Sequence, residues 1–263
     1  MSYWVVALAA VGIGYIAFGF YVLVKKKADA ISRVFMFFAL SVAAWNLSLM
    51  ALVGRLVQSK TAIIVFDRIA YAAAPFIIMS IVFYLVKLRG LSIWQEIKKN
   101  KFLLFLIVLA MVNLILVPTN LISNNQGDSH MVVGSLMPLF GFFVLVALIY
   151  AVYLCYDGWK TGHEDSRRKF WFVLLGLILT SVCSLIFDVV LPILGYQSLP
   201  MVGALSTIFV VWFLGLGAVG VYIAGGALGI ISSILIAIIL SSILIGIAVF
   251  IMFILLAGIL GSV

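Results

Sequence analysis

The stretch SLPMVGALSTIFVVWFLGLGAVGVYIAGGALGIISSILIAIILSSILIGIAVFIMFILLAGILGSV (Ser198–Val263) decides the fold class, because it contains no Lys, Arg, Asp, Glu, His, Asn or Gln. About 20 consecutive apolar residues suffice to cross a bilayer as a helix. This run is far longer, so it is neither a solvated loop nor the core of an ordinary soluble domain. It predicts that this part of the chain lies in lipid, with room for two crossings.

The whole chain has the composition of an integral membrane protein. Of its 263 residues, 67% are hydrophobic and 9% are charged, and the mean hydropathy is +1.37, whereas soluble domains have about 25% charged residues. The apolar runs lack the short alternating pattern of a membrane β-barrel, so the predicted fold class is all-α. Cys155 and Cys183 have no metal-site or CxxC spacing, and we expect no metal or cofactor.

Eight apolar runs predict a polytopic helical bundle. The first run, 3–24, precedes three lysines, the reverse of the order in a cleavable signal peptide, so we expect it to remain as a helix. Residues 1–223 are predicted to form seven helices with the N-terminus outside, and 224–263 to form an additional C-terminal helix. The later runs are 34–54, 62–86, 102–120, 134–156, 170–194, 202–223 and 228–260.

The basic residues give the predicted orientation. Three loops, around 25–33, 87–101 and 160–169, hold 13 of the 16 Lys and Arg residues. With the N-terminus outside, all three loops face the cytoplasm, as the positive-inside rule requires. The charge of +8 is therefore interpreted as membrane topology rather than as nucleic-acid binding.

The middle basic loop has features of a helix. Ser92 and Gln95 have capping-box spacing, and Leu91, Trp94 and Ile97 fall roughly on one helical face. A short interfacial helix with a Trp anchor fits this pattern. An ordinary basic loop fits it equally well.

The first seven runs share aromatic, polar, Gly and Pro marks with a known family. These marks are FALSVAAWN (Phe38–Asn46), DRIAY (Asp67–Tyr71) with Pro75, YAVY (Tyr150–Tyr153), SRRK (Ser166–Lys169), Gly176, Asp188, Pro192, Gly195 and Pro200. Over residues 1–223 the chain resembles the seven-helix N-terminal sensory region of bacterial histidine kinases. The resemblance implies a membrane sensor.

The region after the seventh run departs from that family. There the seventh helix would continue into a cytoplasmic linker and a phosphotransfer or cyclase domain. Here Val221-Tyr222-Ile223 leads into Ala224-Gly225-Gly226 and another apolar run. We therefore expect a protein that is not an enzyme and whose output passes through a partner subunit.

Ionisable residues inside the apolar runs are the candidate ligand site, because charge in the bilayer interior is usually paired or faces a cavity. At 1.5 Å per residue, Arg68 and Asp188 both lie about 10 Å inside the predicted outer surface, and Asn46 and Tyr71 lie only slightly deeper. With Asp67 they form a candidate outward-opening polar pocket. The alternatives are a polar network that only fixes helix packing, or an Asp67-Arg68 pair in the headgroups.

Small residues recur along the last run. Every fourth residue is Gly, Ala or Ser, a spacing that lets membrane helices approach closely. This stripe is a candidate face for homo-oligomerisation or for contact with other membrane subunits, although chance is an equal explanation in a run so rich in small residues. It consists of Gly225, Gly229, Ser233, Ala237 and Ser241.

Three functions are compatible with the sequence. The first is a receptor-like sensor in a prokaryotic plasma membrane. The second is a structural or accessory subunit of a larger membrane complex, and the third is a small-solute transporter. A ligand in the outward pocket would favour the sensor, and a protein partner along 228–260 would favour the subunit.

Overall fold

The computed structural model describes residues 3–54, 56–122, 134–162, 164–184, 207–208, 210–211 and 213–215. Contacts divide the chain into two compact units, Met1–Val219 and Gly220–Val263. All described residues belong to the first unit. The predicted helix at 228–260 lies outside the described residues.

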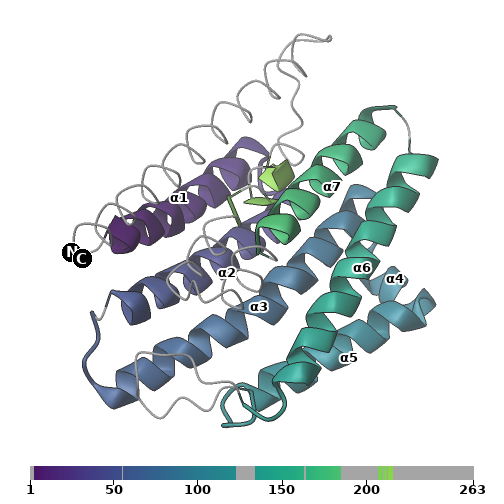
Figure 1. Ribbon diagram of the computed structural model, residues 1–263. Coiled ribbons are helices and arrows are strands. Elements are labelled where there is room, and N and C mark those ends of the chain that lie inside the picture. The colour runs from purple at the N-terminus through teal and green to yellow at the C-terminus, as the bar shows by residue number, and fades with distance from the viewer. Residues whose placement is uncertain are drawn as a thin grey trace, which may run out of the picture. The chain divides into compact units, whose positions relative to one another are not determined.

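The described residues form helices and contain no strand (Figure 1). Residues 207–208, 210–211 and 213–215 are also helical and fall within the predicted run 202–223. The helices are α1 (Tyr3–Lys25), α2 (Ala30–Val53), α3 (Lys60–Leu88), α4 (Ile93–Lys99), α5 (Lys101–Leu116), α6 (Met137–Thr161) and α7 (Glu164–Ser184).

The all-α membrane fold is confirmed for these residues. Four helices, α1, α2, α3 and α6, are long and apolar enough to span a membrane. The pair α4 and α5, bent by 105°, makes a fifth span if it is counted as one. The count of seven helices plus an eighth, and the outside location of the N-terminus, stay predictions.

Helix starts follow local hydrogen bonding. Asp29 caps α2 by accepting a hydrogen bond from the Ser32 backbone N–H at 2.7 Å, and Asn100 caps α5 by accepting from two backbone N–H groups. Ser92 stands at the N-cap of α4, but its side chain makes no capping hydrogen bond. The predicted helix is present, whereas the side-chain capping expected of Ser92 is wrong.

Helix α7 begins earlier than predicted. The sequence suggested a start near residue 170, because 164–169 is highly charged. In the structure Glu164 and Arg168 form an ion pair one helical turn apart, at 2.5 Å. Such pairs stabilise exposed helix ends, so the charged segment extends the helix instead of forming a loop.

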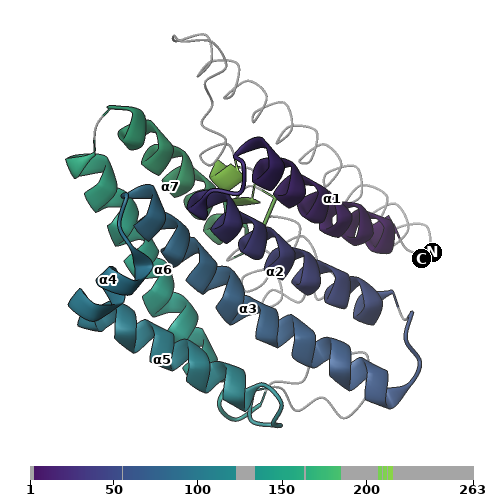
Figure 2. The same cartoon turned by 180° about the vertical axis from the view of Figure 1, so that it is seen from behind.

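The helices pack as neighbours in a defined order. α1 packs on α2 and α2 on α3, α3 contacts α5 and α6, and α6 contacts α7. Figures 1 and 2 show α1, α2 and α3 side by side, with α5 beyond α3. The most fully buried large side chains include Tyr84, Phe35, Phe38 and Phe143.

The helical residues between 207 and 215 belong to the same core. The Tyr15 and Thr207 hydroxyls are hydrogen-bonded at 2.9 Å, and the Tyr84 hydroxyl donates to the Leu214 carbonyl oxygen at 2.8 Å. A Cβ at Gly215 would overlap the Phe18 ring. This segment therefore approaches α1 and α3 closely.

The outside of the bundle is also apolar. Exposed side chains include Ile13, Val24, Ile115 and Ile149, with exposed fractions of 61–75%. A helix that is apolar all round is typical of a membrane span. The surface that would be polar in a soluble protein is here suited to lipid.

Because successive long helices cross the bundle in opposite directions, several basic residues lie together at one end of it. α1 ends, α2 begins, α3 ends, α5 begins, α6 ends and α7 begins at one end of the bundle, which we call the basic end. Lys25, Arg89 and Lys101 lie there, whereas Arg68 lies toward the opposite end, which we call the Arg68 end. The three basic loops predicted to share one side of the membrane therefore lie at one end of the bundle.

Helix α3 contains a proline in its interior. Pro75 is buried within the 29 residues of Lys60–Leu88. Proline has no backbone N–H, so the usual bond to the carbonyl four residues earlier, that of Tyr71, is lost. The helix continues through it because the neighbouring helices pack on both of its halves.

Candidate functional site

Two predicted site residues lie at matching depths on neighbouring helices. Asn46 is seven residues before the end of α2, and Asp67 is seven residues after the start of α3, which places each about 10 Å from its helix end. Both side chains are fully buried. The interpretation of Asp67 as a headgroup-exposed residue is therefore wrong.

The Asn46 side chain is only partly satisfied. Its Nδ2 donates to the Val42 carbonyl oxygen at 3.0 Å, within the same helix. Its Oδ1 is buried and accepts no hydrogen bond from the described part of the chain. A buried acceptor without a donor costs about 1–3 kcal/mol, so this oxygen is poised to accept a hydrogen bond from something else.

Arg68 binds the end of α5. Its Nη1 donates to the Val117 carbonyl oxygen at 2.8 Å and to the Thr119 carbonyl oxygen at 2.5 Å. Its Nη2 donates to the Asn120 side-chain oxygen at 2.9 Å. The last carbonyls of a helix carry partial negative charge, so this is a favourable place for a cation.

The length of α5 explains why this contact forms inside the span. With 16 residues, α5 is about 24 Å long, shorter than the hydrocarbon thickness of about 30 Å. Arg68 lies eight residues inside α3, about 12 Å from its start. The guanidinium therefore meets the end of α5 at that depth and satisfies carbonyls that would otherwise lack donors.

Tyr71 faces a third helix. Its ring packs edge-on against that of Phe140 of α6, with the centroids 5.8 Å apart. It lies about one turn from Arg68 on the face of α3 that meets α5 and α6. Tyr71 follows Asp67 by four residues and Arg68 by three, so it lies one helical turn from both on α3.

The sequence analysis missed a further member of this group, Asn113. It is fully buried in α5, its Nδ2 donates to the Leu109 carbonyl oxygen at 2.8 Å, and no described residue donates to its Oδ1. It stands one turn before Val117, whose carbonyl binds Arg68. The sequence contains an indication of this role, because Asn113 is the single polar residue between Phe102 and Val117.

We call Asn46, Asp67, Arg68, Tyr71 and Asn113 the polar layer. It contains two buried amide oxygens that accept no hydrogen bond from the described residues, the buried Asp67 carboxylate, and the Arg68 guanidinium, which is bound to the end of α5. Among the described residues no group of His, Cys, Asp and Glu is suited to a metal ion.

Other predicted site residues lie outside the described residues. Asp188 is one, so its pairing with Arg68 stays a prediction. The small-residue stripe at Gly225, Gly229, Ser233, Ala237 and Ser241 is the other.

The basic end holds a second set of polar contacts that the sequence did not reveal. Arg89, the C-cap of α3, pairs with Asp157 of α6 at 2.7 Å. The Asn100 Nδ2 donates to the Tyr150 hydroxyl at 2.7 Å. These contacts tie α3, α5 and α6 together where the chain turns from α4 into α5.

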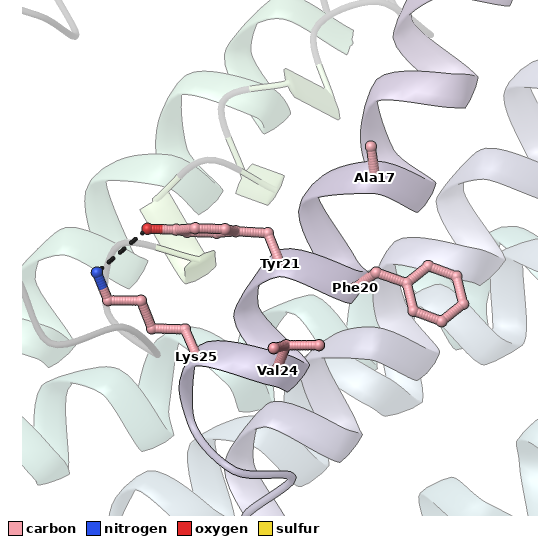
Figure 3. A pocket seen from close by; sticks show the side chains of 5 residues that line it. All are labelled: Ala17, Phe20, Tyr21, Val24 and Lys25. Carbon is pink, nitrogen blue, oxygen red and sulfur yellow. Dashed lines mark hydrogen bonds between the residues drawn. The ribbon is translucent and has the colours of Figure 1, made fainter.

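A surface hollow lies apart from the polar layer. It has a volume of about 460 Å³ and runs along α1, lined by Ala17, Phe20, Tyr21, Val24 and Lys25 (Figure 3). The Lys25 ammonium donates to the Tyr21 hydroxyl at 3.3 Å across it. Its lining is largely apolar and includes none of the predicted site residues.

Comparison with known proteins identifies one family. The family model of the N-terminal 7TM region of histidine kinase matches residues 4–216. No curated protein and no solved structure matches the chain. The family match covers most of the first compact unit.

Proposed function

Because the chain belongs to the family of the N-terminal 7TM region of histidine kinases, we propose that it is a membrane sensor that binds a small ligand in the polar layer and signals through a partner subunit. The match supports a sensory role for residues 4–216. The match names neither a ligand nor a partner.

The observation that carries the proposal is the pair of buried amide oxygens that accept no hydrogen bond from any residue that the structure describes. The Asn46 and Asn113 Oδ1 atoms are buried on α2 and α5 at the Arg68 end. A network that served only to fix helix packing would be expected to satisfy both acceptors. A ligand that donates hydrogen bonds would recover their desolvation cost on binding.

The orientation follows from the basic residues. We place the basic end in the cytoplasm of a prokaryotic cell, with the N-terminus outside, by the positive-inside rule. The polar layer then lies in the outer half of the membrane. A ligand would reach it from outside the cell.

The proposed contact with a partner subunit involves the residues after 216, where the family match ends. They form an apolar run up to Val263, and its stripe from Gly225 to Ser241 supports close contact with another membrane helix. In this proposal the chain itself is not an enzyme, and ligand binding alters a contact between membrane helices.

The test is ligand-dependent thermal stability of the full chain in lipid nanodiscs. The probes are amino acids, sugars, nucleosides and dicarboxylates, each at millimolar concentration. A compound present at 100 times its Kd should add about 2.7 kcal/mol of stability and raise Tm. Asn46→Leu should remain folded, because it removes an unsatisfied acceptor, yet should lose the shift.

Ser41→Ala is the matched control. Ser41 lies on the same helix and its hydroxyl is satisfied by the Phe37 carbonyl oxygen, so this variant should keep the shift. A shift that survives Asn46→Leu and Asn113→Leu together would show that the layer is structural. A chain that responds to no probe and is stabilised only by a co-purified membrane subunit would instead be an accessory subunit.

A further inference from the structure

The short helix α4 presents an aromatic and basic surface at the basic end. Its seven residues, Ile93–Lys99, are followed directly by α5, and the two axes are bent by 105°. Figures 1 and 2 show α4 beside α5 at the basic end. We propose that the outward face of α4 is a binding surface for the headgroups of anionic phospholipids.

The bend fixes the direction of α4. α5 packs against α3 and α6, which are candidate spans, and membrane spans tilt by about 20° on average. A helix close to perpendicular to α5 therefore runs close to parallel with the membrane plane. This is the orientation of interfacial helices.

The two sides of α4 differ in chemistry. Ile93 and Ile97 pack against the core of the bundle, as does Leu91 just before the helix. Trp94, which the spacing predicted to share a face with Leu91 and Ile97, instead lies at the edge of that face and is 65% exposed. The aliphatic side chains of α4 pack against the bundle, so they are not available to insert into lipid. Trp94 and the charged residues are therefore the ones that can contact the membrane surface.

The exposed side carries a net positive charge. Lys98, Lys99 and Lys101 are all exposed, and none of them forms an ion pair with an acidic residue in the described part of the chain. The Lys98 ammonium lies 5.2 Å from the centroid of the Trp94 ring. An indole at the interface beside unpaired ammonium groups is complementary to phosphate headgroups.

The surface is held rigidly. Asn100 caps α5 with its Oδ1, and its Nδ2 donates to the Tyr150 hydroxyl at 2.7 Å and to the Glu96 carboxylate at 3.3 Å. Glu96, the acidic residue of α4, is thus turned toward this junction. The lysines face outward with little compensation from their own helix.

The experiment measures Trp94 fluorescence in nanodiscs that contain phosphatidylglycerol and phosphatidylcholine. In one sample only the phosphatidylglycerol is brominated near the headgroup, and in a second sample only the phosphatidylcholine is. The signal of Trp94 is the difference between the wild-type chain and Trp94→Phe. One lysine near an anionic surface corresponds to about a fivefold local enrichment. We therefore expect brominated phosphatidylglycerol to quench this signal at least about fivefold more effectively than brominated phosphatidylcholine at low salt.

Variants of the lysines test whether these residues cause the preference for phosphatidylglycerol. Lys98→Gln/Lys99→Gln/Lys101→Gln should abolish it, whereas Lys25→Gln/Lys26→Gln/Lys27→Gln, an equal charge change in another loop, should leave it intact. Tm of each variant checks folding, and Lys98→Gln alone provides a milder change with a partial loss. Equal quenching by both lipids, equal loss in the two triple variants, or quenching by aqueous iodide but by neither lipid would each overturn the proposal.

Discussion

The two ends of the bundle hold their arginines by different means. Arg68 lies within the candidate span α3, and its hydrogen-bond partners among the described residues are two backbone carbonyls and the Asn120 amide oxygen at the end of α5. Arg89 closes α3 at the basic end and pairs with the Asp157 carboxylate, with side chains 25% and 27% exposed. The Arg68 guanidinium is thus held by neutral dipoles, and the Arg89 guanidinium by an opposite charge.

The difference follows from solvation. A carboxylate brought beside Arg68 would itself have to leave water, which offsets much of the attraction gained. Backbone carbonyls at a helix end are already inside and lack donors. The comparison teaches that an arginine within an apolar helix can take the carbonyls at a neighbouring helix end as partners.

The largest expected effect concerns which end faces which compartment. In a Cys155→Ala/Cys183→Ala background, Asn125→Cys and Lys160→Cys should be labelled by an impermeant maleimide from opposite sides of the membrane. We expect complete labelling of Asn125→Cys from outside and of Lys160→Cys only after the cells are opened. Labelling of both cysteine variants from the same side would contradict the assumed order of the membrane helices.

The next effect concerns Arg68. Arg68→Leu removes the donors for the Val117 and Thr119 carbonyls, and charged hydrogen bonds contribute about 1.5–3 kcal/mol each. We expect the free energy of unfolding to fall by about 2–4 kcal/mol, with a smaller loss for Arg68→Lys, which cannot make the forked contact. Arg33→Gln, an exposed change at the basic end, is the control and should change stability by less than about 0.5 kcal/mol.

The smallest effect concerns the Arg89–Asp157 pair. Because both side chains are partly exposed, a double-mutant cycle with Arg89→Gln and Asp157→Asn should give a coupling of about 1 kcal/mol or less. The coupling should weaken as salt is added. A coupling as large as the loss at Arg68, and insensitive to salt, would contradict the contrast between the two ends.

The sequence predicted the helices better than it predicted their contacts. Apolar length located the main helices of the described part, since a span requires about 20 such residues. It placed the start of α7 too late because Glu164 and Arg168 stabilise each other only once the helix exists. Helix ends depend on such local pairs more than on hydropathy.

The polar layer shows where sequence reasoning ends. Depth alone grouped Asn46 with Arg68, because the rise per residue converts position into depth, and their membership of one site stays a prediction. It could not reveal that Arg68 meets the end of α5, since that contact depends on how short α5 is and on residues 49 and 51 positions away. The Arg89–Asp157 pair joins distant positions in the same way, and charge in loops gives no indication of partners.

Pro75 gives α3 a mechanical property. The proline removes one rung from the hydrogen-bond ladder between a segment that carries Arg68 and Tyr71 and a segment that ends at Arg89. A helix bends most easily at such a point. The position of the segment before Pro75 therefore depends less on the hydrogen bonds of α3 itself and more on the contacts of Arg68 with the end of α5 and of Tyr71 with Phe140 of α6.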